Sequence, residues 1–466
     1  MKKRTYSYLI IVLTIYAAFT VLFTMLPRST FSALEKRELA TFPTLTLESL
    51  AKGTFTNSVS QWFSDSEPYR DNFMTMSMWF SDNTKLRMFH NNQSKVKFHA
   101  ADSKNLTEGA DVIAAAGNRN IDEYDNQVNA NANAKVAHHG IIIAGEGANV
   151  RALMAYGGAE EGGVNYAKAC NEYQRTFPNV KVYCMLVPTA GEFYCPDAAK
   201  EATKPELPTI QAIHNRLSDS VKVVNAYSAL AAHVKEPIYL RTDHHWAPLG
   251  AFYAAQAFAR VANVPFKELN SYDKKVIHNF VGTMYGFSRD ISVKNAPEDF
   301  VYYVPRGVTY TTDYIHFKTN GNFQTVGEGP KVAGEYFYSY PDGSGAAYST
   351  FMGGDAKITH VNTSTKNGRR LLIIKDSFGN AIPGYLFYSF EDIHVVDFRY
   401  FSKNMKKYVT DNNITDILMF SEIFRAYASG QELINFLTQP DGTYTAKGGG
   451  KNDAADNKKQ AKKRRK

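Results

Sequence analysis

The chain has 466 residues, which is enough for two domains or for one large domain with insertions. Its net charge of +8 comes from the ends: residues 447–466 carry +7, residues 2–4 carry +3, and the rest sums to about −2. A nearly neutral body argues against a nucleic-acid-binding protein, which needs a basic surface on its folded part. Basic ends instead favour anionic surfaces such as lipid headgroups or acidic wall polymers. We predict that the low-complexity tail 447–466 is disordered.

The first 28 residues are predicted to hold a membrane anchor. Between Tyr6 and Leu26 there is no charged residue, and at about 1.5 Å per residue this run spans a hydrocarbon core of ~30 Å. It is longer than the roughly 7–15 apolar residues of a signal-peptide core. The basic residues before it should stay in the cytoplasm, which makes the rest of the chain extracytoplasmic. A cleaved signal peptide is the alternative, although a cut after Ala33 would put Phe31 where a small residue is expected.

Two regions separate the anchor from the main folded part. Residues 29–90 are predicted to form a polar stalk and a membrane-proximal helical region. Residues 91–136 are polar, rich in Asn and Ala and weakly periodic, which predicts an insertion that runs over the surface. The cysteines, Cys170, Cys184 and Cys195, are too few for a disulfide framework and lack the CxxC spacing of a zinc site.

Residues 137–446 alternate between strand-like and helix-like segments. Apolar runs such as "GIIIAGEG", "VKVYCMLVP", "VKVVNAY" and "RRLLIIK" predict buried strands, whereas "VNYAKACNEYQRTF" and "APLGAFYAAQAFARVANV" place apolar residues on one helical face. This alternation predicts an α/β domain with three layers and a mostly parallel sheet. Residues 266–360 break the alternation with short runs rich in Tyr, Gly and Asp, and are predicted to be a β-rich insertion. Ligand sites in such sheets lie beyond the carboxyl ends of the strands.

The stretch "RTDHHWAPLG" places Asp243, His244, His245 and Trp246 just ahead of a predicted helix. Asp243 and His245 can set a carboxylate beside an imidazole, as in the orienting acid and general base of a serine enzyme. Neighbouring histidines on a short loop point in different directions, so at most one of them is expected to act. Two alternatives stay open: Asp243 caps the helix, or the group binds a metal, which needs at least three ligands and to which the histidines of "AHHG" would add.

The stretch "LLIIKDSFGN" places Ser377 where a buried strand must turn into a helix. The free N–H groups at the start of a helix, together with its positive end, would stabilise an alkoxide and an oxyanion there. Serine is a weak nucleophile that needs a base, which His245, oriented by Asp243, would supply. We therefore predict a catalytic triad of Ser377, His245 and Asp243. The alternative is that Ser377 only caps its helix.

Together, the two motifs resemble the DHHW proteins, relatives of the SGNH-like alginate O-acetyltransferases of bacterial envelopes. The resemblance extends from about residue 35 to residue 425 and includes "EKRELATFP", "GTFTNSVSQWFSD" and "PYRDNF" near the membrane. It implies an SGNH-hydrolase-like fold and carries the family's triad to Ser377, His245 and Asp243. It also implies a substrate class, acetyl groups moved to or from extracytoplasmic polysaccharide, and a partner, a multi-pass membrane acyltransferase that delivers acetyl groups across the bilayer.

The resemblance points to further residues near the serine. Asn380, Arg399 and Trp246 are expected to contact an oxyanion or the substrate, with surface or packing roles as the alternative. In "FMGGD", Asp355 stands where an asparagine of the oxyanion hole is expected. A carboxylate there would oppose an oxyanion, so Asp355 is expected to point elsewhere.

The leading prediction is a membrane-anchored, serine-dependent O-acetyltransferase that acts on a cell-envelope or exported polysaccharide through an acetyl-serine intermediate. A carbohydrate acetylesterase would use the same residues with water as the acceptor. An alternative from another class is a noncatalytic protein that binds polysaccharide or scaffolds an export complex. The expected partners are a polysaccharide acceptor, the membrane and the acyltransferase, with no nucleic acid, no cofactor and no metal.

Overall fold

The computed structural model describes part of the chain in two units. Single positions are described before residue 28, and the continuous stretches are 28–32, 37–46, 49–50, 54–83, 116–121, 130–159, 161–319 and 325–442. Contacts between Cα atoms divide the chain into a first unit, Met1–Gln93 with Arg289–Ile291, and a second unit, Ser94–Ser288 with Ser292–Lys466.

The described part of the first unit contains two short strands and two helices. These elements are β1 (Phe31–Ser32), β2 (Arg37–Glu38), α3 (Thr54–Asp65) and α4 (Arg70–Asn83). Strands β1 and β2 pair antiparallel. The guanidinium of Arg28 lies 4.0 Å from the centre of the Trp62 ring and donates a hydrogen bond to the carbonyl of Ser66, 3.2 Å away. These contacts join Arg28 to the end of α3 and the residue that follows it.

In the described ranges, no helix is long and apolar enough to span a membrane. The run from Tyr6 to Leu26, predicted to be the anchor, lies almost entirely outside the described residues. All of the predicted tail 447–466 and most of 91–136 lie outside them too. The anchor and the disordered tail therefore stay predictions.

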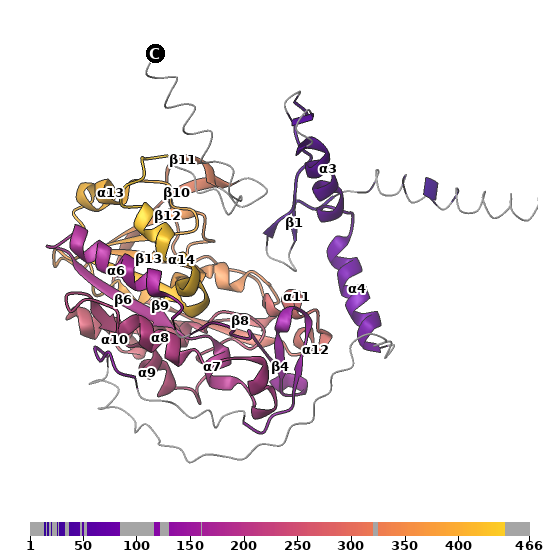
Figure 1. The fold of residues 1–466 in the computed structure, drawn as a ribbon, viewed down its shortest axis with the longest axis horizontal. Coiled ribbons are helices and arrows are strands. Elements are labelled where there is room, and N and C mark those ends of the chain that lie inside the picture. Colours follow the sequence, from indigo (N-terminus) through magenta and orange to yellow (C-terminus); the bar gives the residue numbers. More distant parts are fainter. Residues whose placement is uncertain are drawn as a thin grey trace, which may run out of the picture. The chain divides into compact units, whose positions relative to one another are not determined.

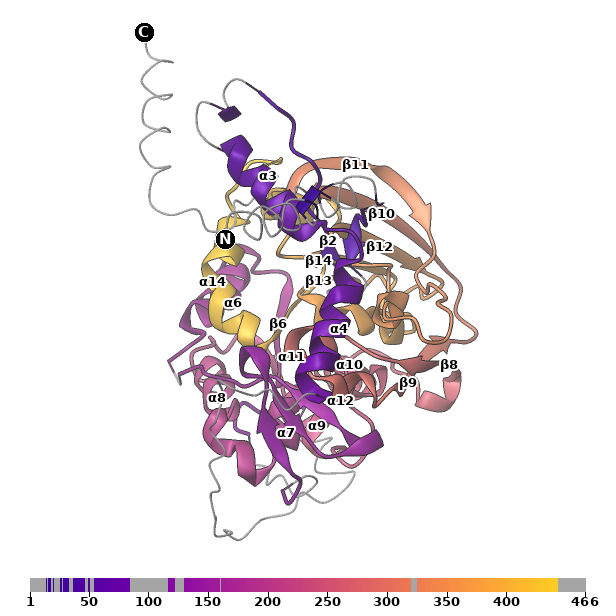
Figure 2. The same ribbon diagram turned by 90° about the vertical axis from the view of Figure 1, so that its right-hand side faces the viewer.

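The second unit is built around an eight-stranded sheet with the strand order β11-β10-β12-β14-β13-β15-β6-β7 (Figures 1 and 2). Its strands are β6 (Lys181–Val187), β7 (Lys222–Val224), β10 (Tyr310–Thr319), β11 (Thr325–Gly334), β12 (Lys357–Thr363), β13 (Arg370–Lys375), β14 (Asp392–Asp397) and β15 (Asp416–Glu422). Nearly all residues of the three strands β13, β14 and β15 are buried, because helices cover both faces of the sheet there.

Two groups of helices form the outer layers. The first group is α6 (Val164–Thr176), α8 (Leu207–His214) and α14 (Ile423–Asn435), and the second is α9 (Ala226–Ala231) and α10 (Pro248–Ala262). The chain runs outward from β6 to β7 through α8, and it then crosses back through α10 and residues 272–305 to β10, near the other edge of the sheet. Right-handed crossovers in opposite directions place their helices on opposite faces of a sheet. The predicted α/β architecture is confirmed.

The sheet is mixed, which corrects the prediction of a mostly parallel sheet. Strands β14, β13, β15, β6 and β7 pair in parallel, but β12, β10 and β11 extend the same sheet through antiparallel pairs. The region 266–360 supplies β10 and β11, so only part of it is an insertion, the antiparallel hairpin of β8 (Tyr272–Phe280) and β9 (Glu298–Pro305). The reason is local: strands joined by a short connection, such as β10 and β11, return antiparallel.

Two segments before the main sheet also differ from expectation. The run "GIIIAGEG" belongs to a separate antiparallel sheet of β3 (Ala134–Val136), β4 (Ile142–Ala144) and β5 (Arg151–Leu153), and not to the main sheet. Within 91–136, Ala116 is buried and its carbonyl accepts the N–H of Asn225, just beyond the edge strand β7, at 2.8 Å. This part of the predicted insertion therefore packs against the domain and is not a surface excursion.

Helices α6 and α14 lie in close contact at Gly430. A Cβ atom added there would lie 2.0 Å from the carbonyl carbon of Asn165. We expect Gly430→Ala to lower the free energy of unfolding by about 1–3 kcal/mol, because the two backbones must move apart. Gly157→Ala, at a position with no atom within 4 Å, is the control and should change it little. Urea denaturation measures both, and equal stabilities would contradict this account of the helix contact.

Candidate active site

The base-bearing segment is a short loop that closes on itself before α10. An isolated antiparallel bridge joins Tyr239 to Trp246, and the N–H of Ala247 donates to the carbonyl of Ile238 at 2.9 Å. Helix α10 then begins at Pro248, a residue suited to the first turn of a helix because it has no N–H to leave unpaired. The loop therefore presents Asp243, His244 and His245 from a fixed backbone, as the prediction of a loop before a helix required.

The serine-bearing segment follows β13 as a tight turn and not as an α-helix. Residues Ser377–Ala381 form a five-residue 3₁₀ helix, and Asp376 is its N-cap, with Oδ1 accepting the N–H of Phe378 at 2.9 Å. Two expectations are corrected here. Ser377 is not the cap, and the N–H of Phe378 is not free to bind an oxyanion. Gly379 and Pro383 explain why the chain turns so tightly, since neither suits an α-helix interior.

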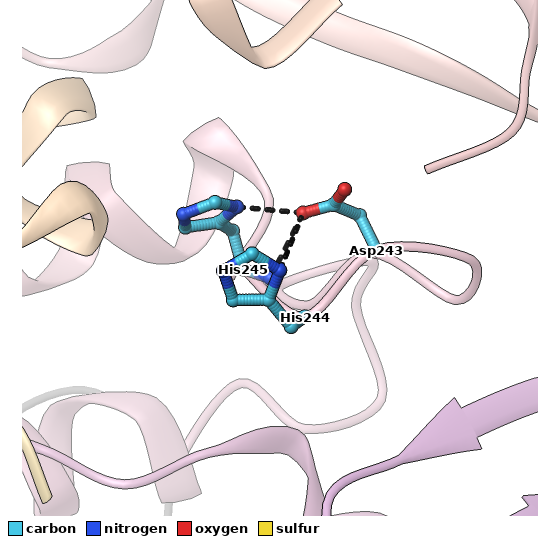
Figure 3. A group of neighbouring side chains, drawn as sticks. All are labelled: Asp243, His244 and His245. Atoms are coloured by element: carbon cyan, nitrogen blue, oxygen red, sulfur yellow. Dashed lines mark hydrogen bonds and ion pairs between the residues drawn. The ribbon is translucent and has the colours of Figure 1, made fainter. Parts of the chain in front are cut away.

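The structure brings together the three residues predicted to form a triad. His245 Nε2 lies 2.9 Å from Ser377 Oγ, and His245 Nδ1 lies 2.6 Å from Asp243 Oδ1. Figure 3 shows the Asp243 carboxylate facing the imidazole of His245. Asp243 is buried, and the Ser377 residue is partly exposed. This order, with a buried acid, an imidazole and the hydroxyl of a partly exposed serine, suits proton transfer from the serine to the histidine.

The remaining hydrogen-bonding capacity of Asp243 is filled from a distant segment. Its Oδ2 accepts the N–H of Thr283 at 2.8 Å and the Thr283 hydroxyl at 2.9 Å, while Oδ1 also accepts the N–H of His245 at 3.1 Å. Gly282 makes room for this contact, since a Cβ there would lie 2.3 Å from the Asp243 Cβ. Sequence reasoning missed Gly282 and Thr283, because a Gly-Thr pair after a strand looks like an ordinary turn.

His244 plays a different part from His245. Its Nδ1 lies 2.7 Å from the Thr283 hydroxyl. The same nitrogen lies 3.6 Å from Asp243 Oδ1 (Figure 3). Since the Thr283 hydroxyl donates to Asp243, it can accept from His244, which makes Thr283 a relay between the two. Of the two histidines, His245 is the one that lies at hydrogen-bond distance from Ser377, and the expectation that at most one of them acts stays a prediction.

The metal alternative rests on Asp243, His244 and His245, whose ligand atoms lie within 4.8 Å of one another. His138 and His139 do not join this group among the described residues. The 2.6 Å between Asp243 Oδ1 and His245 Nδ1 is a hydrogen-bond distance. Two ligands of a tetrahedral zinc at ~2.0 Å are separated by ~3.3 Å. The arrangement therefore fits a proton-transfer relay better than a metal site.

A network of charged side chains lies beside the relay, with Lys375 and Asp397 buried and Asp355 and Arg399 partly buried. Asp355 Oδ1 accepts from Asn380 Nδ2 at 2.7 Å and from Lys375 Nζ at 3.3 Å, and Asp355 Oδ2 lies 2.9 Å from Arg399 Nη2. Both cations also pair with Asp397, at 3.0 Å for Lys375 and 2.6 Å for Arg399. Burial alone would raise the pKa of the Asp355 carboxyl, but the two cations and the Asn380 hydrogen bond hold it far below its usual range.

This network revises the expectations for the residues around the serine. Asp355 does not point away from the site, since its carboxylate accepts a hydrogen bond from Asn380 in the turn that carries Ser377. Two cations neutralise it instead, which offsets the repulsion that it would exert on an oxyanion. Asn380 and Arg399 lie in the same network, and the buried Oδ1 of Asn380 has no hydrogen-bond partner among the described residues. Their contacts with an oxyanion or a substrate stay predictions.

The expected substrate contact of Trp246 is wrong. Its side chain is fully buried, and the indole Nε1 donates to the backbone carbonyl of Phe378 at 2.8 Å. The ring also packs against Phe420, with 5.7 Å between the ring centres. A side chain with no exposed surface cannot bind a polysaccharide, so Trp246 belongs to the interior.

The turn that carries Ser377 is fastened to the end of β15 through the carboxylate of Asp376. Asp376 Oδ2 accepts the N–H of Glu422 at 2.8 Å, and Glu422 in turn caps α14 by accepting the N–H groups of Phe424 and Arg425. Burial raises the pKa of Glu422 to about 8, and the neighbouring Asp376 charge adds to the effect. Glu422 is therefore protonated in the fold at neutral pH.

This pair should make stability fall as pH rises. Between about pH 4.5 and pH 8 the unfolded chain has lost the Glu422 proton that the fold keeps, so unfolding is favoured as pH rises through that window. We expect the free energy of unfolding to decrease by an amount on the order of 1–3 kcal/mol between pH 5 and pH 8, and to decrease less in Glu422→Gln. Urea denaturation at several pH values measures it, with Glu201→Gln at an exposed position as control. Identical pH slopes for Glu422→Gln and the wild type would rule the explanation out.

Comparisons with known proteins show which family the chain resembles. A family model described as "DHHW protein" matches residues 35–93 and 109–396, and no curated protein matches the chain. A crystal structure of a DHHW family protein from Eubacterium siraeum is 39% identical, with a TM-score of 0.58, over 66% of this chain and 97% of that one. Two further structures are more distant. Bacillus cereus PatB1 with a sulfonyl adduct is 20% identical, with a TM-score of 0.47, over 66% of this chain and 99% of that one. The O-acetyltransferase domain of Pseudomonas putida AlgJ is 11% identical, with a TM-score of 0.34, over 65% of this chain and 99% of that one.

The TM-scores of the two distant structures, 0.47 and 0.34, are too low to assign the chain to their families. The family match, in contrast, covers most of the chain and includes the DHHW loop and the serine turn, and the Eubacterium siraeum protein matches almost over its whole length. The resemblance inferred from the two motifs is confirmed: the chain belongs to the DHHW protein family.

Proposed function

We propose that the protein is a serine-dependent O-acetyltransferase that modifies a cell-envelope or exported polysaccharide, held at the membrane by its N-terminal apolar segment. One observation supports the catalytic part: Ser377, His245 and Asp243 form a continuous hydrogen-bonded chain beyond the carboxyl end of β13. The acetyl group, the polysaccharide and the multi-pass acyltransferase partner come from the family's resemblance to the alginate O-acetyltransferases.

In the first half-reaction, Ser377 Oγ attacks the carbonyl carbon of an acetyl ester. His245 Nε2 takes the hydroxyl proton, and the imidazolium that forms is stabilised by Asp243. The tetrahedral intermediate then collapses, the bond to the donor oxygen breaks, and His245 returns the proton to that oxygen. The products are acetyl-Ser377 and the free donor alcohol.

In the second half-reaction, a sugar hydroxyl gives its proton to His245 Nε2 and attacks the acetyl-serine carbonyl. The bond to Ser377 Oγ breaks, and the proton passes from His245 back to the serine. Water in place of the sugar gives hydrolysis, which is the acetylesterase alternative. An intact relay disfavours the noncatalytic alternative, because binding or scaffolding alone does not require these three side chains to align.

The relay predicts that Ser377 is a reactive nucleophile. Full-length protein treated with a serine-directed fluorophosphonate should gain one adduct, which mass spectrometry maps to Ser377. Ser377→Ala should gain none, and His245→Ala should react on the order of 10³-fold or more slowly, because the serine loses its base. Ser220→Ala, at an exposed position, should react like the wild type.

A folded wild type that gains no adduct would refute the proposed nucleophile. If the adduct forms, acetyl transfer from an aryl acetate to a polysaccharide is compared with release of free acetate. Transfer that rises with added glycan at the expense of hydrolysis supports the transferase, whereas hydrolysis unaffected by glycan supports the esterase.

The support of Asp243 by Thr283 gives a second prediction. Thr283→Val removes the hydroxyl that donates to Asp243 Oδ2, so we expect labelling to slow about tenfold as the carboxylate loses a donor. Thr283→Ser keeps the hydroxyl and should stay near the wild-type rate. Thr312→Val is the matched control, because that buried hydroxyl has no hydrogen-bond partner among the described residues. A Thr283→Val rate equal to that of Thr312→Val would contradict the role of Thr283.

A further inference from the structure

One backbone carbonyl near the site accepts hydrogen bonds from two buried side chains. The carbonyl oxygen of Phe378 lies 2.8 Å from Trp246 Nε1 and 2.9 Å from the Tyr348 hydroxyl. A carbonyl has two lone pairs, so both are used. We call Trp246, Tyr348 and this carbonyl the carbonyl clamp.

The carbonyl clamp involves the residues next to the base and next to the nucleophile in the chain. Trp246 is the residue after His245, and Phe378 is the residue after Ser377. The bond from Trp246 to Phe378 therefore joins the neighbour of the base to the neighbour of the nucleophile, across 132 residues of sequence. Two segments fixed to each other one residue away from the reacting atoms have little freedom to change the 2.9 Å between His245 Nε2 and Ser377 Oγ.

Tyr348 adds a second constraint on the base. Its ring is nearly parallel to the His245 imidazole, with 3.8 Å between the ring centres and 9° between the planes. His244 lies on the imidazole too, at 3.8 Å and 38°. Burial raises the pKa of the Tyr348 phenol well above its usual value, so the hydroxyl keeps its proton and remains a donor.

We propose that Trp246 and Tyr348 are positioning residues that hold His245 at reaction distance from Ser377 through the carbonyl of Phe378. The inference rests on the proposed function, because it concerns the reactivity of Ser377. It gives the tryptophan of the DHHW motif a task that packing alone does not require: a phenylalanine would fill most of the same volume but could not donate to the carbonyl. The contacts of both residues run to the Phe378 carbonyl and, for Tyr348, to the His245 ring.

The test compares labelling rates of the full-length chain with the serine-directed fluorophosphonate. The variants are Trp246→Phe, Tyr348→Phe and the double variant, which keep aromatic rings and remove one or both donors. Tyr173→Phe is the matched control, since this buried tyrosine on α6 also donates to a backbone carbonyl, that of Leu433, at 3.1 Å. We expect each single variant to react about tenfold more slowly and the double variant about a hundredfold more slowly.

Two readouts separate positioning from folding. A misfolded fraction that does not refold lowers the final stoichiometry, while the folded fraction keeps the wild-type rate constant. A variant with a misplaced base labels to one adduct per chain, but with a lower rate constant at every pH on the plateau of the pH profile. The proposal expects the second result.

The outcomes also separate this inference from the proposed function. A wild type without adduct removes the proposed function and the inference together. A reactive wild type with a double variant less than tenfold slower overturns the inference and leaves the proposed function in place. If the double variant does not fold, Tyr348→Phe decides alone: a rate constant at least threefold below that of Tyr173→Phe supports the inference, and a smaller difference overturns it.

Discussion

The arrangement of the site depends on one buried charge, the carboxylate of Asp243. A carboxylate taken out of water loses several kcal/mol of solvation unless hydrogen bonds replace it. Here four donors do so: the N–H and Nδ1 of His245, and the N–H and hydroxyl of Thr283. Two of these donors come from the base loop and two from the distant Thr283 segment. The same bonds orient the imidazole so that its other nitrogen meets Ser377, so solvation of the acid and orientation of the base are one structural requirement.

The direction of one strand determines the electrostatics around this relay. Strand β12 runs antiparallel to β14, so the residues before β12 lie at the edge of the sheet where β13 and β14 end. Asp355 precedes β12 and therefore meets Lys375 and Arg399 at that edge. A parallel β12 would have carried Asp355 to the opposite edge and left the two cations with Asp397 alone. The departure from a parallel sheet thus supplies the second carboxylate that balances them.

The turn that carries Ser377 is also held in place by hydrogen bonds that involve no reacting atom. Asp376 ties the serine turn to the end of β15, and the clamp of Trp246 and Tyr348 ties it to the base loop. The turn is therefore held by the strand before it, by the neighbouring strand and by the loop that carries the base. Short 3₁₀ geometry needs such support, because it makes few hydrogen bonds of its own. The rigid surroundings suit a site in which proton transfer depends on distances held within tenths of an ångström.

The sequence by itself determined the local features: the buried strand before Ser377, the loop before α10 that carries Asp243 and His245, and the α/β alternation around them. These depend on residues close together in the chain, whose periodicity and turn chemistry are visible in a short window. Only the tertiary structure decided that Thr283 and Gly282 complete the acid, that Trp246 is buried, that Asp355 stays beside the relay and that β12 runs antiparallel. Those features come from hydrogen bonds and strand pairs between segments tens to more than a hundred residues apart. A short stretch of sequence does not predict such pairings, because they stabilise the protein only after folding has brought the distant segments together.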